Sequence, residues 1–184
     1  MNRFEYRIHL LVRQVRAVRE HLGVKWAPKK SLLPGSSRTP LIVSLTSFPA
    51  RISSCSLAIE SIFQQSVRPD KIVLALAEEE FPARIIPRNL TRQIPRGLEI
   101  LWVKDNHRSF DKLVPTVLRY PDADIVTIDD DKLLPKTFIS ELVRAHEEYP
   151  RAIIGFRGWE MVSRDGEIRY GENWRRATWE TDSD

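Results

Sequence analysis

The chain has 184 residues, 42% of them hydrophobic and 29% charged, proportions that are typical of a folded globular domain and exclude general disorder. Its single cysteine, Cys55, excludes a disulfide framework and a cysteine-based zinc site, and the four histidines show no zinc-ligand spacing. No apolar run approaches the roughly 20 residues of a membrane-spanning helix, so the composition predicts a folded domain in a reducing, cytoplasmic compartment.

The net charge of +4 is spread unevenly along the chain. Residues 1–38 hold nine Lys and Arg residues against two Glu residues, a local charge of +7. The remaining residues hold 20 basic and 23 acidic side chains, which gives −3. A basic arm on a slightly acidic body argues against nucleic acid as a partner, and the arm is expected to meet something anionic.

The first segment, residues 1–27, is predicted to be a basic amphipathic helix that ends near Gly23. Within residues 3–22, apolar side chains recur at three- and four-residue steps, with arginines on the other faces. Such a helix can pack on its own domain, pack on a second copy, or lie in a membrane interface beside anionic head groups. In the last case it would hold the protein peripherally at the inner face of the cell membrane.

From residue 41 onward, short apolar runs rich in β-formers alternate with helical segments. The preceding stretch, residues 28–40, has no period and is predicted to be a linker. The predicted strands are the apolar runs 41–46, 71–76, 98–103, 124–128 and 152–156. Continuous apolar strands that alternate with helices indicate an α/β fold with a mostly parallel sheet and helices on both faces.

The helices between the strands are predicted from caps, prolines and apolar spacing. After the first strand, Ser53 or Ser54 is expected to cap a helix that ends at Gln64. The proline-containing stretch 81–95 is expected to hold only a short helix, near Ile85 or Leu90. The two remaining helices are predicted to begin at Ser109, with an early break at Pro115, and at Pro135.

The run Asp129-Asp130-Asp131 follows the fourth predicted strand. Three adjacent carboxylates repel one another, and oxygen ligands favour hard divalent cations such as Mg²⁺ or Mn²⁺. The alternative is a strand that simply ends in a solvated polar loop, where Asp is common. Parallel sheets bind ligands beyond the carboxyl ends of their strands, the edge at which this run and residues 46–51 are both expected. That position favours a cation site that in turn holds an anion.

The residues after the first strand exclude several α/β chemistries. Thr46 and Ser47 stand where phosphatases of the haloacid-dehalogenase type need a nucleophilic Asp and where receiver domains need an acidic pair. The phosphate-loop pattern Gly-x-x-x-x-Gly-Lys and the pattern Gly-x-Gly-x-x-Gly are both absent from the sequence. A metal ion with cationic side chains therefore remains as the way to hold a diphosphate.

Over residues 41–160, the sequence resembles the GT-A glycosyltransferases of the family 2 type. Val43–Ile52 looks like the first strand and its turn, and Leu57–Leu74 looks like the helix and the Pro-Asp-x-Ile turn into the second strand. Asp129–Asp131 matches the Asp-x-Asp metal motif in order and spacing. The resemblance implies a Rossmann-like half that binds a nucleotide-diphosphate sugar and transfers the sugar to a glycan or lipid-linked acceptor, in bacterial surface polysaccharide or glycoconjugate synthesis.

The resemblance also implies roles for single residues. Asp131 would ligate Mn²⁺ or Mg²⁺, and Asp129 would contact the ribose or belong to the metal shell. Asp130 could take either role or point inward to accept backbone hydrogen bonds. Lys112 could meet a donor phosphate or be an ordinary surface lysine, and Arg108 is a second candidate for the same contact. The residues expected to border the nucleotide are Thr46, Ser47, Phe48 and Arg51, with Phe48 available to stack on the base.

The sequence departs from the family pattern in two places. Where many members carry a base-contacting Asp after the second strand, this chain has Ala77-Glu78-Glu79-Glu80. The catalytic base is expected after the fifth strand. None of the acidic candidates there lies in a recognisable motif: Glu160, Asp165, Glu172, Glu180 and Asp182. Residues 161–184 therefore look like the start of an incomplete acceptor-side region. The alternative is a degenerate domain of the same fold that binds a nucleotide or a partner without turnover.

Overall fold

The computed structural model describes residues 23–24, 28–30, 32, 39–156 and 158, and the backbone of four short strands after them. The chain divides into two compact units, residues 1–140 and 141–184. The amphipathic helix predicted for residues 3–22 lies outside the described residues, while Gly23 and Val24 at its expected end are helical. In the part that is described, no helix has the length and apolar character needed to cross a bilayer.

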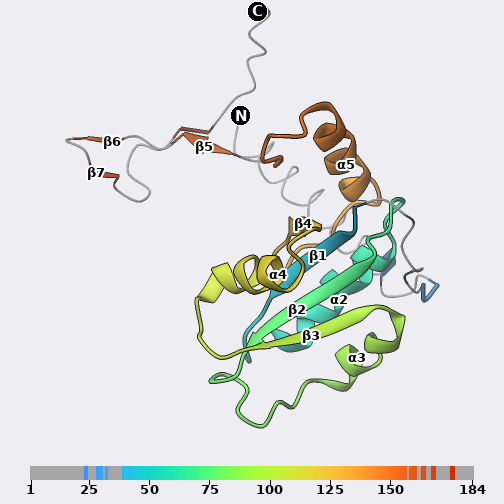
Figure 1. Cartoon of the computed structure of the whole chain (residues 1–184). Coiled ribbons are helices and arrows are strands. Elements are labelled where there is room, and N and C mark those ends of the chain that lie inside the picture. The colour runs from blue at the N-terminus through green and yellow to red at the C-terminus, as the bar shows by residue number, and fades with distance from the viewer. Residues whose placement is uncertain are drawn as a thin grey trace, which may run out of the picture. The chain divides into compact units, whose positions relative to one another are not determined.

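The first unit is built on a four-stranded parallel sheet (Figure 1). Its strands are β1 (Leu41–Thr46), β2 (Lys71–Ala77), β3 (Leu98–Val103) and β4 (Asp124–Thr127). Their order across the sheet is β3-β2-β1-β4, and every neighbouring pair is parallel. These four strands confirm the prediction to within one residue at each end, because each is a mostly apolar run of the kind that a doubly covered sheet requires.

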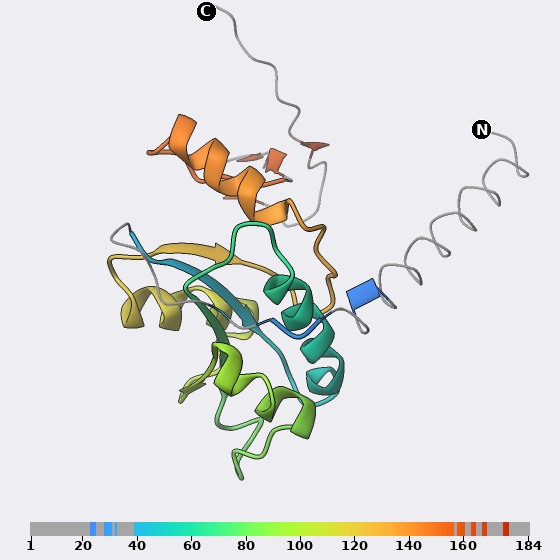
Figure 2. The same ribbon diagram turned by 90° about the vertical axis from the view of Figure 1, so that its right-hand side faces the viewer.

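Helices cover both faces of this sheet, as the two views in Figures 1 and 2 agree. Helix α2 (Ile52–Phe63) lies on one face and α4 (Val114–Arg119) on the other. The core is formed mainly by the central strands and α2, through the fully buried side chains Val43, Leu45, Ile59, Ile62, Phe63, Ile72 and Leu74. The α/β class predicted from the sequence is therefore confirmed.

Helix α2 begins earlier than the sequence suggested. The predicted cap at Ser53 or Ser54 was wrong, because both lie inside the first turn and Arg51 occupies the N-cap position. The start is fixed by a tight turn, in which the backbone N–H groups of Arg51 and Ile52 each donate to the carbonyl of Phe48 over 2.9 Å. This turn holds Arg51 directly beside the end of β1.

Except for α5, the other helical segments are short. They are α3 (Arg88–Thr91), the 3₁₀ turns η1 (Ile94–Arg96) and η2 (Arg108–Lys112), α4, and α5 (Phe138–Glu148). The short helix expected near Leu90 is confirmed. Ser109 lies inside η2 rather than capping a helix, and Pro115 lies in the first turn of α4 rather than breaking one, because the fixed φ of proline suits that turn. Helix α5 begins at Phe138 rather than at Pro135.

The fifth strand predicted at residues 152–156 is wrong. This segment follows α5 without strand pairing to any described strand, and the side chain of Ile153 is fully exposed. An apolar, β-branched run favours a strand, but a strand also needs a partner edge. In the second unit, the described pairs are antiparallel: β5 (Trp159–Glu160) with β8 (Arg175–Arg176), and β6 (Ser163–Arg164) with β7 (Glu167–Ile168).

Of the base candidates after the predicted fifth strand, Glu160 lies in β5. The remaining four, Asp165, Glu172, Glu180 and Asp182, lie outside the described residues.

Three residues of the predicted linker 28–40 are hydrogen-bonded to side chains and backbone of Gln64 and Arg96 in the same unit. The carbonyl of Pro28 accepts a hydrogen bond from Gln64 Nε2 over 2.8 Å, and that of Lys30 accepts one from Arg96 Nε over 2.7 Å. The backbone N–H of Leu32 donates to the carbonyl of Arg96 over 2.8 Å. Because Arg96 lies two residues before the start of β3 and Gln64 is the C-cap of α2, this anchor lies at the amino-terminal edge of the sheet.

Gly97→Ala is expected to destabilise the first unit by about 1–3 kcal/mol. Gly97 has φ +118°, and an added Cβ would lie 2.7–2.9 Å from side-chain atoms of Leu32. Both the backbone strain and the displaced leucine should lower the midpoint of urea unfolding. Gly23→Ala is the matched control, since Gly23 is helical and a Cβ there would meet nothing within 4 Å. Equal midpoints for the two variants would contradict this prediction.

Candidate functional site

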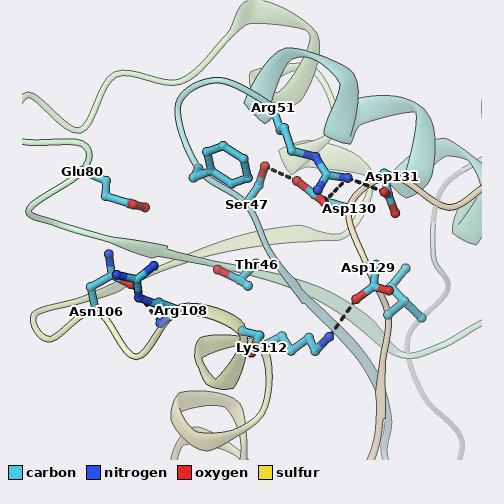
Figure 3. A pocket seen from close by; sticks show the side chains of 13 residues that line it. Thr46, Ser47, Arg51, Glu80, Asn106, Arg108, Lys112, Asp129, Asp130 and Asp131 are labelled. Atoms are coloured by element: carbon cyan, nitrogen blue, oxygen red, sulfur yellow. Dashed lines mark hydrogen bonds and ion pairs between the residues drawn. The ribbon is translucent and has the colours of Figure 1, made fainter. Parts of the chain in front are cut away.

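A pocket of about 570 Å³ opens at the carboxyl edge of the sheet (Figure 3). Its lining comes from the segments that follow all four strands: Thr46, Ser47, Phe48, Arg51, Glu80, Asn106, Arg108, Ser109, Lys112, Ile128, Asp129, Asp130 and Asp131. All nine residues that the sequence analysis named as candidates for binding the nucleotide or the metal are among them. The structure therefore brings together residues up to 85 positions apart in the chain.

The strand order explains why a pocket forms at this edge. The chain runs from β1 outward to β2 and β3, and then returns to the opposite side of β1 for β4. At such a reversal the connections after the two adjacent strands diverge, which leaves a crevice between them. The two segments that diverge here are residues 46–51, after β1, and residues 128–131, after β4.

Asp130 joins these two segments. Its side chain is buried and accepts a hydrogen bond from Ser47 Oγ over 2.6 Å. It also pairs with Arg51 at 3.1 Å. Of the three alternatives given for Asp130 above, the contacts agree with a side chain that points into the protein. Its hydrogen-bond donors are side chains, however, and not the expected backbone N–H groups. Asp130 therefore ties the end of β4 to the end of β1.

The hydroxyl groups of Thr46 and Ser47 are also used inside the protein. Thr46 Oγ1 donates to the carbonyl of Ala75 in β2 over 2.8 Å, and Ser47 Oγ donates to Asp130. These contacts fix the end of β1. We therefore interpret both residues as parts of the pocket wall whose hydroxyls position neighbouring segments.

Asp131 and Asp129 present their carboxylates to the pocket, with side chains 43% and 57% exposed. Asp131 Oδ2 lies 2.5 Å from Arg51 Nη2, and Asp129 Oδ1 lies 2.8 Å from Lys112 Nζ. Although partial burial raises the pKa of Asp131, hydrogen bonds from Arg51 and from Lys132 outweigh it and lower that pKa below its ordinary value. Asp131 is therefore charged at neutral pH, and each of the two carboxylates is paired with a cationic side chain.

Arg51 and Phe48 form a second pair of neighbours in the pocket. The guanidinium carbon of Arg51 lies 5.8 Å from the centre of the Phe48 ring, within the range of a cation–π contact. The hydrogen bond to Asp131 raises the pKa of Arg51 further above its already high value. Phe48 is 41% exposed, so its ring offers a surface on which a planar base could stack.

The loop after β3 holds Arg108 in an unusual backbone conformation. Arg108 has φ 56°, in the left-handed region that non-glycine residues rarely adopt. The side chain of Asn106 stabilises this turn by accepting the Arg108 N–H over 2.9 Å, and buried Asp111 accepts the N–H of His107 over 3.2 Å. Strained positions of this kind cluster at ligand sites, and Arg108 lines the pocket.

Sequence reasoning missed Asn106, Ser109 and Glu80. An Asn that accepts a backbone hydrogen bond two residues on is a recognised turn pattern, which could have indicated Asn106. No comparable signal singles out Glu80 among the three consecutive glutamates. The structure distinguishes them, because Glu78 pairs with Arg84 at 2.5 Å while Glu80 lines the pocket.

The donor set fits a divalent cation only if an anionic ligand completes its shell. Among the described residues, no group of three or more His, Cys, Asp or Glu side chains is arranged to hold a metal. Magnesium, however, is usually bound through one or two carboxylates together with waters and substrate phosphates. Asp129 and Asp131 supply hard oxygen ligands of that kind. The residues therefore fit a cation shared with a phosphate ligand and do not fit a cage made by protein alone.

The charge of the pocket leads to the same conclusion. Its lining holds four carboxylates, at Glu80 and residues 129–131, against three cationic side chains, Arg51, Arg108 and Lys112. This formal charge of −1 would oppose a diphosphate. A divalent cation would reverse its sign and favour binding.

Comparisons with known proteins found similarity only among solved structures. No protein-family model and no curated protein sequence matches the chain. Among solved structures, the chain is similar to a mannosyltransferase from Pyrobaculum calidifontis in complex with GDP-Man and Mn²⁺, with 18% sequence identity and a TM-score of 0.44. The match covers 74% of this chain but 39% of that protein, so this chain corresponds to less than half of its length. The functional roles of the pocket residues are therefore inferred from the geometry and charge of the pocket.

Proposed function

We propose that the first unit binds a nucleotide-diphosphate sugar together with Mn²⁺ or Mg²⁺, and that the protein is a glycosyltransferase that moves the sugar to an acceptor hydroxyl. The observation that carries the proposal is the pairing of two exposed carboxylates, Asp129 and Asp131, with cationic side chains around one pocket at the β1–β4 reversal. A metal-bound diphosphate needs both kinds of group, carboxylates for the cation and cationic donors for the phosphate oxygens.

The chemistry follows from where negative charge develops. When bound, the cation stabilises the charge that builds up on the leaving diphosphate as the glycosidic bond breaks. Lys112 and Arg108 line the pocket and can donate to phosphate oxygens. Phe48 can stack on the base, while Asp130 and Ser47 keep the two sides of the crevice in register. The proposed role is in bacterial surface polysaccharide or glycoconjugate synthesis, and the proposed acceptor is a glycan or a lipid-linked molecule.

A second candidate function is supported by the ion pairs themselves. Lys112 and Arg51 neutralise Asp129 and Asp131 without any metal, as would suit a domain that binds nucleotides but does not turn them over. Both candidates predict nucleotide binding. Release of free nucleoside diphosphate during incubation with a nucleotide sugar and an acceptor extract supports the transferase, and binding without release supports the non-catalytic domain.

Nucleotide sugars and Mn²⁺ together are expected to raise the melting temperature more than either alone. A ligand present at about 100 times its Kd stabilises the folded state by about 2.7 kcal/mol, which for a chain of this length corresponds to roughly 5–10 °C. A thermal-shift panel of GDP-, UDP-, ADP- and CDP-sugars, each with Mn²⁺ and with EDTA, measures this. An equal rise in EDTA would contradict the metal bridge, and no rise with any nucleotide would contradict the function.

A further inference from the structure

The guanidinium of Arg51 is held at the acidic run through one nitrogen atom. Nη2 lies 2.5 Å from Asp131 Oδ2 and 3.1 Å from Asp130 Oδ1 (Figure 3). Asp130 is buried and fixed by Ser47, whereas Asp131 is well exposed in the pocket. Arg51 therefore has one rigid partner and one partner that faces the ligand space.

Arg51 can also reach a ligand from where it stands. A guanidinium carries several N–H donors in a planar fork, and both ion pairs here use the same nitrogen. The side chain is 37% exposed and lines the pocket beside Phe48. The fork geometry matches the paired oxygens of a phosphate group. Arg51 thus combines a contact to a candidate metal ligand with donors suited to the ligand's diphosphate.

The contact between Arg51 and Asp131 competes with direct coordination of a cation by the same carboxylate oxygen. A divalent ion bound by Asp131 Oδ2 would meet the positive guanidinium at short range. A cation that binds Oδ2 is therefore expected to displace Arg51 from Asp131. Asp130 remains as its second partner and keeps the side chain at the site during that exchange.

We propose that Arg51 pairs with Asp131 when no metal is bound and moves to the donor's diphosphate when a divalent cation binds. The inference rests on the proposed function and adds a coupling to it. Arg51 opposes binding of the cation alone, because it occupies the carboxylate, and favours the complex of cation and diphosphate, because it then gains phosphate oxygens. Cation and nucleotide consequently bind together more tightly than their separate affinities would give.

Arg51→Met tests the exchange by two affinities that should move in opposite directions. Titration with MnCl₂ alone, followed by electron paramagnetic resonance of the free ion, should show about tenfold tighter Mn²⁺ binding than in wild type. Calorimetric titration with UDP or GDP at saturating Mn²⁺, using whichever binds wild type more tightly, should show at least about tenfold weaker binding. Loss of a purely structural side chain would weaken both.

Two further variants complete the test. Lys132→Met removes the other cationic side chain beside Asp131. Lys132 contacts Asp131 at 3.3 Å but does not line the pocket, so this variant should change each affinity by less than about threefold. Arg51→Lys keeps the charge but not the fork, so Mn²⁺ alone should bind as in wild type and the nucleotide more weakly. This variant carries the test if circular dichroism shows that Arg51→Met is misfolded.

The inference is overturned if Arg51→Met leaves Mn²⁺ binding unchanged or weaker, or if Arg51→Lys changes both affinities alike. Failure of the proposed function has a different result: wild-type protein then binds no nucleoside diphosphate at saturating Mn²⁺. The titration with Mn²⁺ alone still decides in that case whether Arg51 competes with a cation for Asp131.

Discussion

Asp131→Asn is expected to abolish the Mn²⁺-dependent part of nucleotide binding while the protein stays folded. An amide has nearly the same size as a carboxylate but lacks the charge that a divalent cation requires. Metal affinity should fall by at least about 100-fold, the upper end of the range for changes around metal ligands. Because the side chain of Asp131 is 43% exposed, the lost ion pair with Arg51 should cost less than about 1 kcal/mol of stability. Calorimetric titration with Mn²⁺ and a nucleoside diphosphate measures the first effect.

Asp122→Asn is the matched control for that experiment. Asp122 is an exposed carboxylate in the same unit and is not among the residues that line the pocket. The control makes the same change of net charge, so it separates general electrostatics from loss of a ligand. Equal retention of the Mn²⁺ effect in both variants would remove Asp131 from the metal site.

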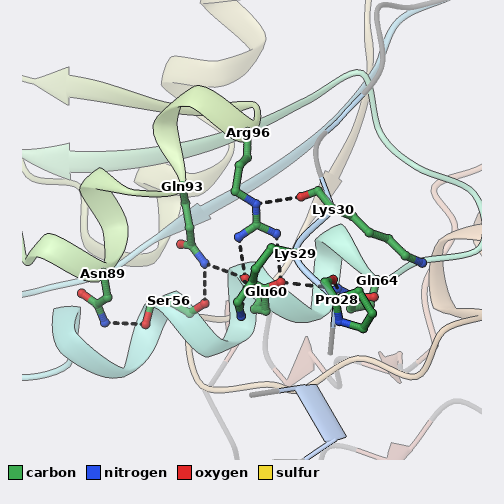
Figure 4. A network of polar contacts seen from close by, with 9 residues as sticks. All are labelled: Pro28, Lys29, Lys30, Ser56, Glu60, Gln64, Asn89, Gln93 and Arg96. Carbon is green, nitrogen blue, oxygen red and sulfur yellow. Dashed lines mark hydrogen bonds and ion pairs between the residues drawn. The ribbon is translucent and has the colours of Figure 1, made fainter. Parts of the chain in front are cut away.

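Glu60→Ala is expected to destabilise the protein by about 3–5 kcal/mol, the usual cost of breaking a buried ion pair from one side. The side chain of Glu60 is 4% exposed, and its two oxygens lie 2.7 and 2.9 Å from the two terminal nitrogens of Arg96 (Figure 4). Without Glu60, Arg96 would keep a largely buried charge over the ring of Phe63, 4.1 Å away. Urea unfolding followed by circular dichroism gives the free energy.

Glu99→Ala supplies the comparison, because Glu99 also has several partners but is more exposed. Its carboxylate contacts Lys71 at 2.8 Å and Tyr120 at 2.5 Å, with 24% of the side chain accessible. We expect this variant to lose no more than about 1.5 kcal/mol. A similar loss in both variants would mean that burial adds nothing to the interaction between Glu60 and Arg96.

The same ion pair predicts a dependence of stability on pH. Burial raises the pKa of Glu60, but the hydrogen bonds from Arg96 outweigh it, and the folded-state pKa lies below the ordinary value. The carboxylate of Glu60 therefore binds a proton more readily in the unfolded chain than in the folded one. The ion pair contributes its full stabilisation at pH values above the pKa of the unfolded state, about 4.3. It is lost as the pH falls through the folded pKa. The stability difference between wild type and Glu60→Gln should accordingly shrink below about pH 4.

The sheet and the position of the pocket could be predicted because they depend on local patterns. Each of the four strands is a mostly apolar run, and the carboxyl ends of parallel strands necessarily meet at one edge. Residues 152–156 have the same composition and are not a strand, since composition does not supply a neighbouring edge. The cap of α2 was misplaced for a similar reason, because the turn that closes on Phe48 depends on backbone geometry.

The internal pairing of the site could not be predicted from spacing. Ser47 and Asp130 are 83 residues apart, and nothing local indicates that one of three adjacent aspartates turns inward to meet the serine. The same holds for Arg51, whose partners become evident only when β1 and β4 lie side by side. Chemistry-bearing residues were thus found by type and position, while their division into pocket-facing and wall-forming groups required the fold.

The anchor of residues 28–32 has a practical consequence. It fixes the chain to Gln64 and Arg96, at the amino-terminal edge of the sheet, whereas the pocket opens at the carboxyl edge. A fluorescent reporter attached within residues 28–30 would therefore lie on the side of this unit away from the pocket mouth. Such a reporter should leave the pocket mouth open to soluble nucleotides during a fluorescence titration.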